Sequence, residues 1–271
     1  MRVILSFFCI YFFFSCEIPQ KKSKTIISIT EQEKQEKILI PTIDTILIGK
    51  NKIYETPYYR FNSKKKGPVI LIEAGIHGNE IAGHLAMDSL LKNIHQVDSG
   101  ILILFPRMNR PACVANKRFL NIDLNLVFPG DTTKNDYEHS LANEIFKMIG
   151  KEKIEYVITL HESLYLHNPK IRKTYGQTFV YGIDSLPSYF NEWMEKVNNK
   201  TEIDPHTGKS EQFYPYYFPI PTSSTETFVE TYDLKGGFCI ETWRGFRLDR
   251  RIEMQYIVMT SFLETLGIQF H

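Results

Sequence analysis

A histidine and a glutamate stand three residues apart at a turn, in the stretch Gly75-Ile76-His77-Gly78-Asn79-Glu80. An apolar run over residues 69–72 precedes this turn and a helical pattern over residues 81–91 follows it, which predicts a buried strand, a glycine turn and a helix. If Glu80 lies in the first helical turn, both side chains can point at one spot. Imidazole and carboxylate are ligands that zinc accepts. The pattern indicates a metal site, although a glutamate here can also simply favour the positive end of the helix.

Two further candidate side chains come directly after apolar runs that read as strands. His161 follows residues 156–160, and Glu241 follows residues 238–240. In open α/β sheets, sites form at the carboxyl ends of the strands. We therefore expect both side chains to lie near His77.

The combined residues make a set that is typical of a catalytic zinc site. His77, Glu80 and His161 supply two imidazoles and one carboxylate, which leaves a fourth coordination position open. Glu241 is then free to act as a base. Glu162, next to His161, is expected to serve the strand end or the surroundings of the metal.

The elements that must position these residues alternate along the chain. Unbroken apolar strands separated by helices predict an α/β fold with a mixed, largely parallel sheet and helices on both faces. The first two strands are expected to form an antiparallel pair, and Asp249 is expected to cap the last helix. The aromatic stretch 213–219 is expected to be a loop that packs on the domain or closes over a substrate. Strands are predicted at 45–48, 58–61, 69–72, 101–105, 156–160, 178–181 and 238–240, and helices at 81–91, 141–149, 190–197 and 249–266.

Composition limits the class of protein. The chain has 271 residues, of which 43% are hydrophobic, and this is enough for one domain with a sizeable core. Its 32 Lys and Arg residues nearly balance 31 Asp and Glu residues, so no field that would attract nucleic acid is expected.

The N-terminus is predicted to be a separate exported segment. Residues 3–14 are apolar, too short to span a membrane as a helix but suited to a signal peptide, here residues 1–15. Ser15-Cys16 resembles a bacterial lipobox, so Cys16 is expected to be lipidated; the alternative is ordinary secretion with cleavage close to Cys16. Residues 16–38 then form a polar tether and residues 39–271 the catalytic domain. This predicts a membrane-anchored lipoprotein facing the periplasm or the cell exterior.

Two cysteines remain in the predicted domain. Cys113 and Cys239 can pair in an oxidising compartment, or they can be two separate buried thiols.

A second stretch points to a known family. Residues 108–118 include Asn109-Arg110-Pro111 and Arg118, and residues 121–130 read Asn-Ile-Asp-Leu-Asn-Leu-Val-Phe-Pro-Gly. Together with the histidine–glutamate turn, they resemble the zinc carboxypeptidase superfamily, and within it the succinylglutamate desuccinylase/aspartoacylase-like branch. The resemblance covers roughly residues 65–266 and implies a carboxypeptidase-like α/β fold that binds Zn²⁺.

The resemblance also implies roles for single residues. Arg118 matches the arginine that polarises the scissile carbonyl, and Glu241 matches the general acid/base. The zinc ligands it implies are His77, Glu80 and His161.

One position departs from the family pattern. Asn125 matches the asparagine that helps to hold a substrate carboxylate, but the arginine expected next is Leu126. Leucine cannot form the bidentate pair that grips a carboxylate. Arg244 or Arg247, just after Glu241, can replace it.

The predicted function is a zinc-dependent hydrolase that cleaves an amide bond of a peptide or a peptidoglycan stem peptide, as a metallocarboxypeptidase does. One alternative is an N-acyl amino acid deacylase, to which the branch resemblance points. A different class is a binding lipoprotein that has lost catalysis, which Leu126 favours and the intact ligand set opposes. The expected partners are one of these substrates and, through the lipid anchor, a membrane; no nucleic acid is expected.

Overall fold

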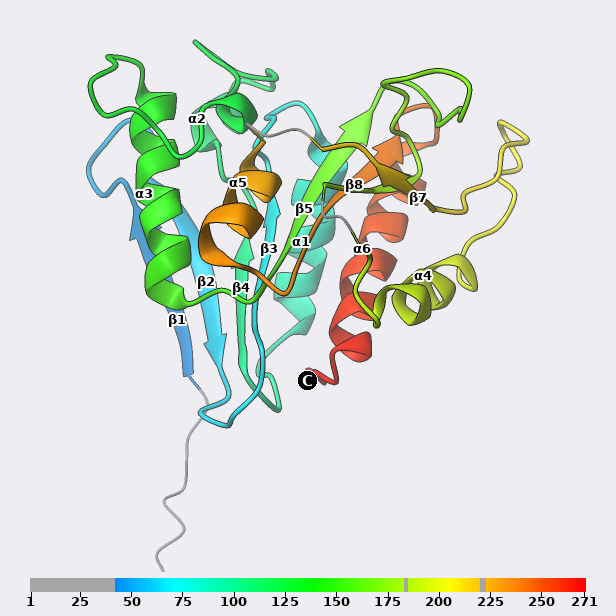
Figure 1. Cartoon of the computed structure of the whole chain (residues 1–271), viewed down its shortest axis with the longest axis horizontal. Coiled ribbons are helices and arrows are strands. Elements are labelled where there is room, and N and C mark those ends of the chain that lie inside the picture. The colour runs from blue at the N-terminus through cyan, green and yellow to red at the C-terminus, as the bar shows by residue number, and fades with distance from the viewer. Residues whose placement is uncertain (1–41, 183–184, 220–222) are drawn as a thin grey trace, which may run out of the picture. The chain divides into compact units, whose positions relative to one another are not determined.

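The structure is a computed structural model that describes residues 42–182, 185–219 and 223–271. The predicted signal peptide, the tether and Cys16 lie outside the described residues. Within the described ranges the chain forms one eight-stranded sheet in the order β1-β2-β4-β3-β5-β8-β6-β7 (Figure 1). The strands are β1 (Thr42–Ile48), β2 (Thr56–Asn62), β3 (Val69–Ala74), β4 (Ile101–Phe105), β5 (Tyr156–Ser163), β6 (Thr178–Tyr181), β7 (Tyr214–Tyr217) and β8 (Gly236–Trp243).

The middle of the sheet is parallel and its two sides are not. β3 pairs in parallel with both β4 and β5, and β5 pairs in parallel with β8. β1 and β2 form the expected antiparallel pair, and β2 continues antiparallel to β4. β6 is antiparallel to β8, and β7 is parallel to β6. The predicted fold class, a mixed and largely parallel sheet, is confirmed.

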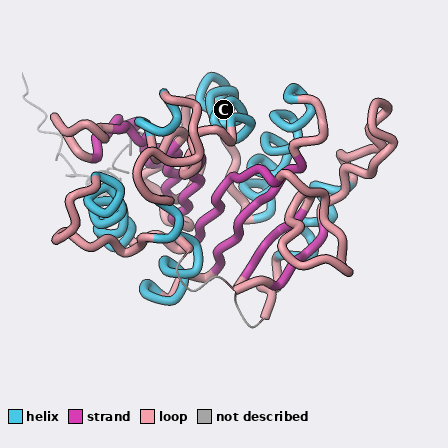
Figure 2. Tube along the Cα trace, turned by 90° about the horizontal axis from the view of Figure 1, so that it is seen from above, coloured by secondary structure: helices cyan, strands magenta, loops and turns pink. Residues whose placement is uncertain are grey.

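Helices cover both faces of this sheet, as Figure 2 shows with the strands running between them. The helices are α1 (Ile81–Asn93), α2 (Arg110–Val114), the 3₁₀ turn η1 (Leu124–Leu126), α3 (Tyr137–Glu152), α4 (Phe190–Asn198), α5 (Ser224–Tyr232) and α6 (Leu248–Thr265). No helix in these ranges is long and apolar enough to cross a membrane.

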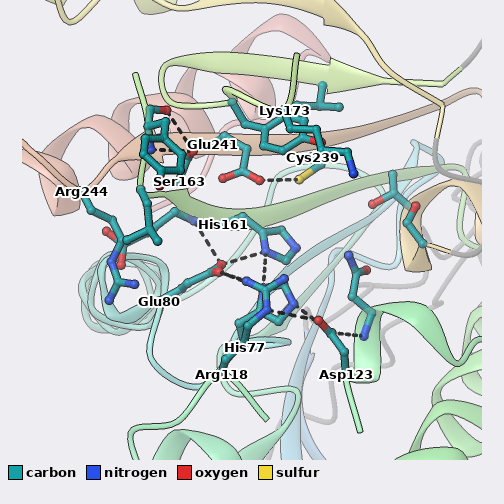
Figure 3. A pocket seen from close by; sticks show the side chains of 18 of the residues that line it. His77, Glu80, Arg118, Asp123, His161, Ser163, Lys173, Cys239, Glu241 and Arg244 are labelled. Atoms are coloured by element: carbon teal, nitrogen blue, oxygen red, sulfur yellow. Dashed lines mark hydrogen bonds and ion pairs between the residues drawn. The ribbon is translucent and has the colours of Figure 1, made fainter. Parts of the chain in front are cut away.

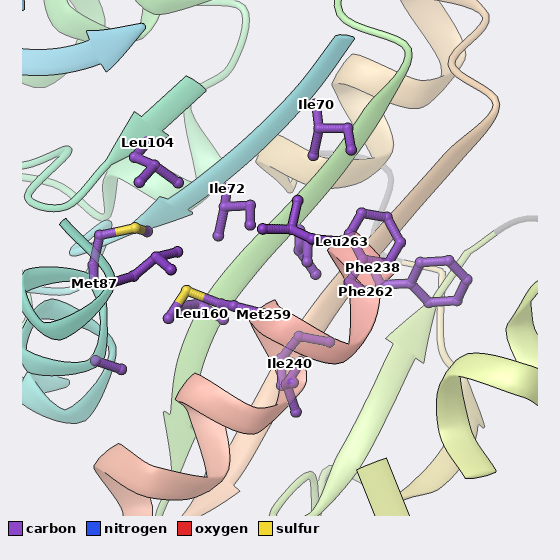
Figure 4. Packing of buried hydrophobic residues seen from close by; sticks show 14 of the residues in the cluster. Ile70, Ile72, Met87, Leu104, Leu160, Phe238, Ile240, Met259, Phe262 and Leu263 are labelled. Atoms are coloured by element: carbon purple, nitrogen blue, oxygen red, sulfur yellow. The ribbon is translucent and has the colours of Figure 1, made fainter. Parts of the chain in front are cut away.

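Alternate residues of each central strand feed two separate cores. Ile70 and Ile72 of β3 point into a cluster with α1, α4 and α6, whereas Leu71 points into a second cluster with α3 and α5. Figure 4 shows the first cluster, in which Ile72 and Leu160 lie near Met259 of α6. Side chains of a strand alternate between its faces, so a strand buried on both faces needs the unbroken apolar run seen here. Each large side chain that is fully buried stabilises the fold by about 1.5–3 kcal/mol.

Three sequence predictions need correction, and one helix was missed. The stretch 213–219 is not a loop, because β7 occupies Tyr214–Tyr217 at the sheet edge, where the strand tolerates its proline. α5 was not predicted. Asp249 does not cap α6; the cap position is Arg247, and Asp249 lies in the first turn. β5 and β8 run to Ser163 and Trp243, so His161 and Glu241 lie within strands and not after them.

Candidate active site

A cavity of about 380 Å³ opens over the carboxyl ends of β3, β5 and β8. The β3–α1 turn brings His77 and Glu80 to it, β5 brings His161 and β8 brings Glu241 (Figure 3). The strand register places His161 opposite Glu241. Because side chains alternate along a strand, His161 and Glu241 share the face that carries α5, and Glu162 points to the opposite face. The structure therefore brings together the four residues that the sequence put at strand ends.

Glycines allow the β3–α1 turn to pack closely against α2 and the residue that precedes it. A Cβ on Gly78 would stand 2.1 Å from the backbone carbonyl carbon of Ala112, so only glycine fits there. Gly75 has a positive φ of 76°, and its carbonyl accepts a hydrogen bond of 2.9 Å from the backbone N–H of Asn109. The turn is thus fixed to the loop that follows β4.

Glu80 precedes α1 instead of lying in its first turn. It holds the N-cap position with φ −96° and ψ 72°. Its carboxylate accepts a 3.1 Å hydrogen bond from the backbone N–H of Glu162. The Glu162 side chain in turn accepts from the backbone N–H of Ala82 at 3.1 Å and pairs with Arg251 of α6. Glu162, which also lines the cavity, therefore supports the site by holding Glu80 and the start of α1, as expected.

Three buried side chains form the centre of the site. The Nδ1 atom of His77 lies 2.9 Å from one oxygen of Glu80, and Nδ1 of His161 lies 2.8 Å from the other. The two Nδ1 atoms are 3.1 Å apart. One potential ligand atom from each residue lies within 4.8 Å of the others, so the donors converge on a single point.

A fourth residue orients the first histidine. The Nε2 atom of His77 lies 3.0 Å from Oδ1 of Asp123. An Nε2–H that donates to this carboxylate leaves the Nδ1 lone pair directed at Glu80 and His161. Metal-binding histidines commonly donate their other ring N–H to a carboxylate in this way. The donor set and its support fit a zinc ion.

The same cluster holds a proton tightly. Burial is the largest single effect and disfavours the charged form of His77, but the charge of Glu80 and the hydrogen bonds with Asp123 and Glu80 together outweigh it and raise the pKa of His77 to about 9. Burial lowers the pKa of His161. Glu80 favours the charged form of both rings, but at His161 burial outweighs it and the charge of His77 lowers the pKa further, so the proton stays on His77. A metal ion must displace this proton, since its ligands bind deprotonated.

Glu241 presents a carboxylate oxygen that has no hydrogen-bond partner in the part of the chain that the structure describes. Its Oε2 atom is shielded from solvent and has no hydrogen-bond partner among the described residues. Its Oε1 atom lies 3.9 Å from the thiol of Cys239. Burial raises the pKa of Glu241 well above its usual range, and the charge of Glu80 adds to this. Such a carboxyl group can take a proton near neutral pH.

Arg118 and Asn125 line the same cavity. The Arg118 guanidinium donates to Glu80 at 3.1 Å and to Asp123 at 3.1 Å. The side-chain oxygen of Asn125 accepts from the backbone N–H of Ser224 at 3.1 Å and from its hydroxyl at 3.0 Å. Because the oxygen is held by α5, the Asn125 NH₂ group is the part that a substrate can use.

The structure separates the two arginines proposed to replace the family arginine. Leu126 lines the cavity and is 51% exposed. Arg244 also lines it, but its Nη2 donates to the carbonyl of Asn79 at 2.7 Å. Arg247 pairs with Asp249 at 3.0 Å outside this cavity lining.

Sequence reasoning missed several cavity residues. Asp123 belongs to the Asp-Leu-Asn stretch that carries the family resemblance. Its place in that stretch was the signal that could have marked it as a site residue. Lys173 lines the cavity from the 164–177 loop with a left-handed φ of 62°, and no local pattern marks it. Cys239 lies two residues before Glu241, and the strand alternation places both on one face. Cys113 and Cys239 are both free thiols, so they do not pair.

The fold and the buried His-Glu-His cluster define an α/β protein with a candidate metal site. Residues 66–165 match the Succinylglutamate desuccinylase/Aspartoacylase catalytic domain. The resemblance predicted from the sequence is thereby confirmed over residues 66–165.

Two curated relatives support the same resemblance over short stretches. The chain is 40% identical over 70 residues to N-alpha-acetyl-L-2,4-diaminobutyric acid deacetylase of Halomonas elongata, covering 24% of this chain and 20% of that protein. It is 30% identical over 106 residues to succinylglutamate desuccinylase of Pseudomonas fluorescens, covering 35% and 31%. The chain thus spans less than a third of the length of these relatives.

Solved structures share the fold. The cell shape determinant protein Csd4 from Helicobacter pylori, in its apo form, superposes with a TM-score of 0.68 at 20% identity, covering 85% of this chain and 56% of that one. An aspartoacylase family protein from Mesorhizobium loti gives a TM-score of 0.60 at 17% identity, covering 84% and 67%. At these identities the likeness concerns the fold alone.

Proposed function

We propose that this protein is a zinc-dependent hydrolase that cleaves an amide bond of a peptide or a peptidoglycan stem peptide. The observation that carries the proposal is the buried cluster of His77, Glu80 and His161 beside the unpartnered oxygen of Glu241. Three ligands plus an open position and a nearby base are the parts that metal-assisted hydrolysis needs. An inactive binding protein would have no need of a buried carboxylate oxygen left without a partner, which is costly.

The peptide substrate class rests on a structural neighbour. Csd4 is described as a D,L-carboxypeptidase, and its structures include an mDAP-bound and a tripeptide-bound form. The alternative, an N-acyl amino acid deacylase, is favoured by the family match and by both curated relatives, whose names describe a deacetylase and a desuccinylase. Both candidates use the same amide chemistry and differ in what flanks the bond.

The chain's own residues would divide the reaction between them. A zinc ion held by the cluster would supply Lewis-acid chemistry, polarising the scissile carbonyl and making water more acidic. Glu241 would accept the proton of the attacking water and return it to the leaving amine. Arg118, 49% exposed on its side chain, would donate to the oxyanion; losing one such donor typically costs about 2.7–4 kcal/mol. The Asn125 NH₂ group would orient the substrate.

One experiment tests this function. The zinc-loaded protein is incubated with peptides, muropeptides and N-acyl amino acids, and the products are identified by mass spectrometry. Wild type should release an amine from one class, and Glu241→Gln should keep its zinc but lose activity by roughly 10²–10⁴-fold. Near-normal turnover in Glu241→Gln would refute the assigned base, and no product from any class would refute the proposal.

We further propose that the domain is exported and anchored through Cys16, with residues 1–15 as signal peptide, 16–38 as tether and 39–271 as catalytic domain. The support is the apolar run that ends in Ser15-Cys16. Cells fed a labelled fatty acid should label the wild type but not Cys16→Ser. Equal labelling of both would rule out this site.

A further inference from the structure

A second group of metal donors lies against the predicted zinc ligands. Cys239, Glu241 and His161 each offer a donor atom, and these three atoms lie within 4.8 Å of one another. Cys239 and Glu241 are two residues apart on β8, so their side chains leave the strand on the same face. Figure 3 shows the Cys239 sulfur and the Glu241 carboxylate facing each other, with the His161 ring beneath them. A thiol, a carboxylate and an imidazole therefore meet at one wall of the cavity.

The polar atoms of this group are poorly satisfied by the protein. Glu241 Oε2 is shielded from solvent and has no partner within residues 42–182, 185–219 and 223–271. The contact between Cys239 Sγ and Glu241 Oε1, at 3.9 Å, is long even for a thiol donor. A shielded carboxylate oxygen without a partner costs free energy that a bound cation would recover.

Cys239 is placed to act as a metal ligand. Its sulfur lines the cavity and faces the Glu241 carboxylate (Figure 3). A metal ion bound here would take the sulfur as a thiolate, because a coordinating thiol gives up its proton, here to solvent. The predicted zinc ligands, His77, Glu80 and His161, contain no sulfur. The two groups of donors therefore differ in the ions they prefer, since thiolate selects softer ions.

We infer that Cys239, Glu241 and His161 form a second metal-binding set, which overlaps the predicted zinc site and takes soft divalent cations such as cadmium. His161 belongs to both sets, so the second ion sits directly beside the first position or competes for this ring. An ion in the second set also occupies Glu241. It therefore blocks hydrolysis, and this consequence rests on the proposed function, whereas the binding itself does not.

Cadmium absorption tests the binding without any substrate. The full-length protein is first loaded with one equivalent of zinc, and cadmium is then added while the thiolate-to-cadmium charge-transfer absorption in the ultraviolet is recorded. Only a cadmium–sulfur bond produces this band. Wild type should show a saturable rise that Cys239→Ser abolishes. The matched control is Cys113→Ser, because the Cys113 thiol lies 3.6 Å from His84 and does not line the cavity; it should keep the full band.

Two additions keep the test decisive. Cys239→Ala is measured beside Cys239→Ser, with circular dichroism as a check on folding, and Glu241→Gln should bind cadmium more weakly than wild type. In the hydrolysis assay, Cys239→Ser should need about tenfold more cadmium for half inhibition. A band that persists unchanged in both Cys239 variants would overturn the inference, as would a wild type without any band. A protein that shows the band but hydrolyses no substrate would contradict the proposed function and leave this metal set established.

Discussion

The carboxylate of Glu80 joins the two histidines of the cluster, and two of the three side chains have a further support. His77 is oriented by Asp123, and Glu80 also accepts from the backbone of Glu162. Removing one ligand should therefore leave the others in place. The loss would appear as weaker metal binding instead of a collapsed site.

His161→Ala removes one of the three predicted ligands. Wild type should contain about one zinc per chain, as a single site requires, and the variant should lose most of it under dialysis. The measurement is metal analysis of the purified protein. The control is His206→Ala, a histidine outside the cavity lining, which should keep its zinc. Equal zinc in wild type and His161→Ala would show that His161 is no ligand.

Leu126→Arg tests how the cavity recognises a carboxylate. A charge-assisted hydrogen bond contributes roughly 1.5–3 kcal/mol, against about 1 kcal/mol for a neutral one. The variant should therefore raise the preference for a free carboxylate over its amide by about tenfold or more. The measurement is kcat/KM on paired acid and amide substrates.

A wild type that already prefers the free acid by several orders of magnitude would contradict this account of Leu126. Lys173 would then be the cation to test, because it lines the cavity and Arg247 does not. Lys173→Ala should remove the preference, and Lys170→Ala, outside the cavity lining, should not.

At the scale of elements, one buried ion pair ties β5 to two helices. The Glu162 side chain of β5 accepts a hydrogen bond from the backbone N–H of Ala82 in the first turn of α1, and it forms an ion pair with Arg251 of α6. The Arg251 side chain is 13% exposed and the Glu162 side chain is 0% exposed. Its backbone N–H holds Glu80. The position of Glu80 therefore depends on contacts with an element more than 80 residues away.

Arg251→Met should destabilise the domain strongly. It leaves the Glu162 carboxylate buried without its cation, and breaking a buried pair from one side costs about 3–5 kcal/mol. Arg247→Met is the matched control, because Arg247 pairs with Asp249 at the exposed start of the same helix, where solvent screens the pair and it contributes little to stability. Urea unfolding of both variants measures the difference. Equal losses would show that the Glu162 pair contributes no more than a surface pair.

The elements themselves were largely predictable, and the exceptions have physical reasons. The unbroken apolar runs of β3, β4 and β5 predicted buried parallel strands. The sequence did not predict β7, because Tyr-Pro-Tyr-Tyr contains a proline, which a strand tolerates at the edge of a sheet but not in its middle. The sequence did not predict α5, because few of its residues are large and apolar. Ser223 caps this helix, and Phe228 is its main buried apolar side chain.

At the scale of the molecule, a carboxyl group lies in the middle of the sheet. Glu73 of β3 is fully buried and accepts a hydrogen bond from Thr159 at 2.8 Å, while its other oxygen has no partner within the described ranges. Burial raises the pKa of Glu73 to about 8, against a smaller lowering by the Thr159 hydrogen bond. The folded protein therefore keeps this proton at neutral pH, and the unfolded chain does not.

This makes stability dependent on pH in a definite direction. A raised carboxyl pKa means that the folded state binds more protons than the unfolded state between about pH 4.5 and pH 8, so the free energy of unfolding falls as pH rises through this window. A difference of one between the folded and the unfolded pKa values lowers the free energy of unfolding by about 1.4 kcal/mol across this window. Glu73→Gln stays neutral and still accepts from Thr159, so it should be more stable than wild type at pH 8 and show a flatter profile.

Urea unfolding between pH 5 and pH 9 measures this difference. Glu192→Gln, on the exposed side of α4, should follow the wild-type profile, because its side chain is 61% exposed. Identical slopes for wild type and Glu73→Gln would show that Glu73 titrates in its ordinary range. Other titrating groups, including His77, are common to all three proteins and cancel in the comparison.

The sequence by itself determined the donor types, the apolar strands that carry them and the departure at Leu126, because side-chain chemistry and strand alternation are local properties. Only the tertiary structure decided which atoms meet. His77 and Asp123 are 46 residues apart, and Arg244 and Asn79 are 165 apart. Such distances depend on the order in which strands enter the sheet and on close fits such as that of Gly78 against Ala112, which no single stretch encodes. The pairing of Asp123 with His77, the entry of Lys173 into the cavity and the approach of Cys239 to Glu241 follow from that order.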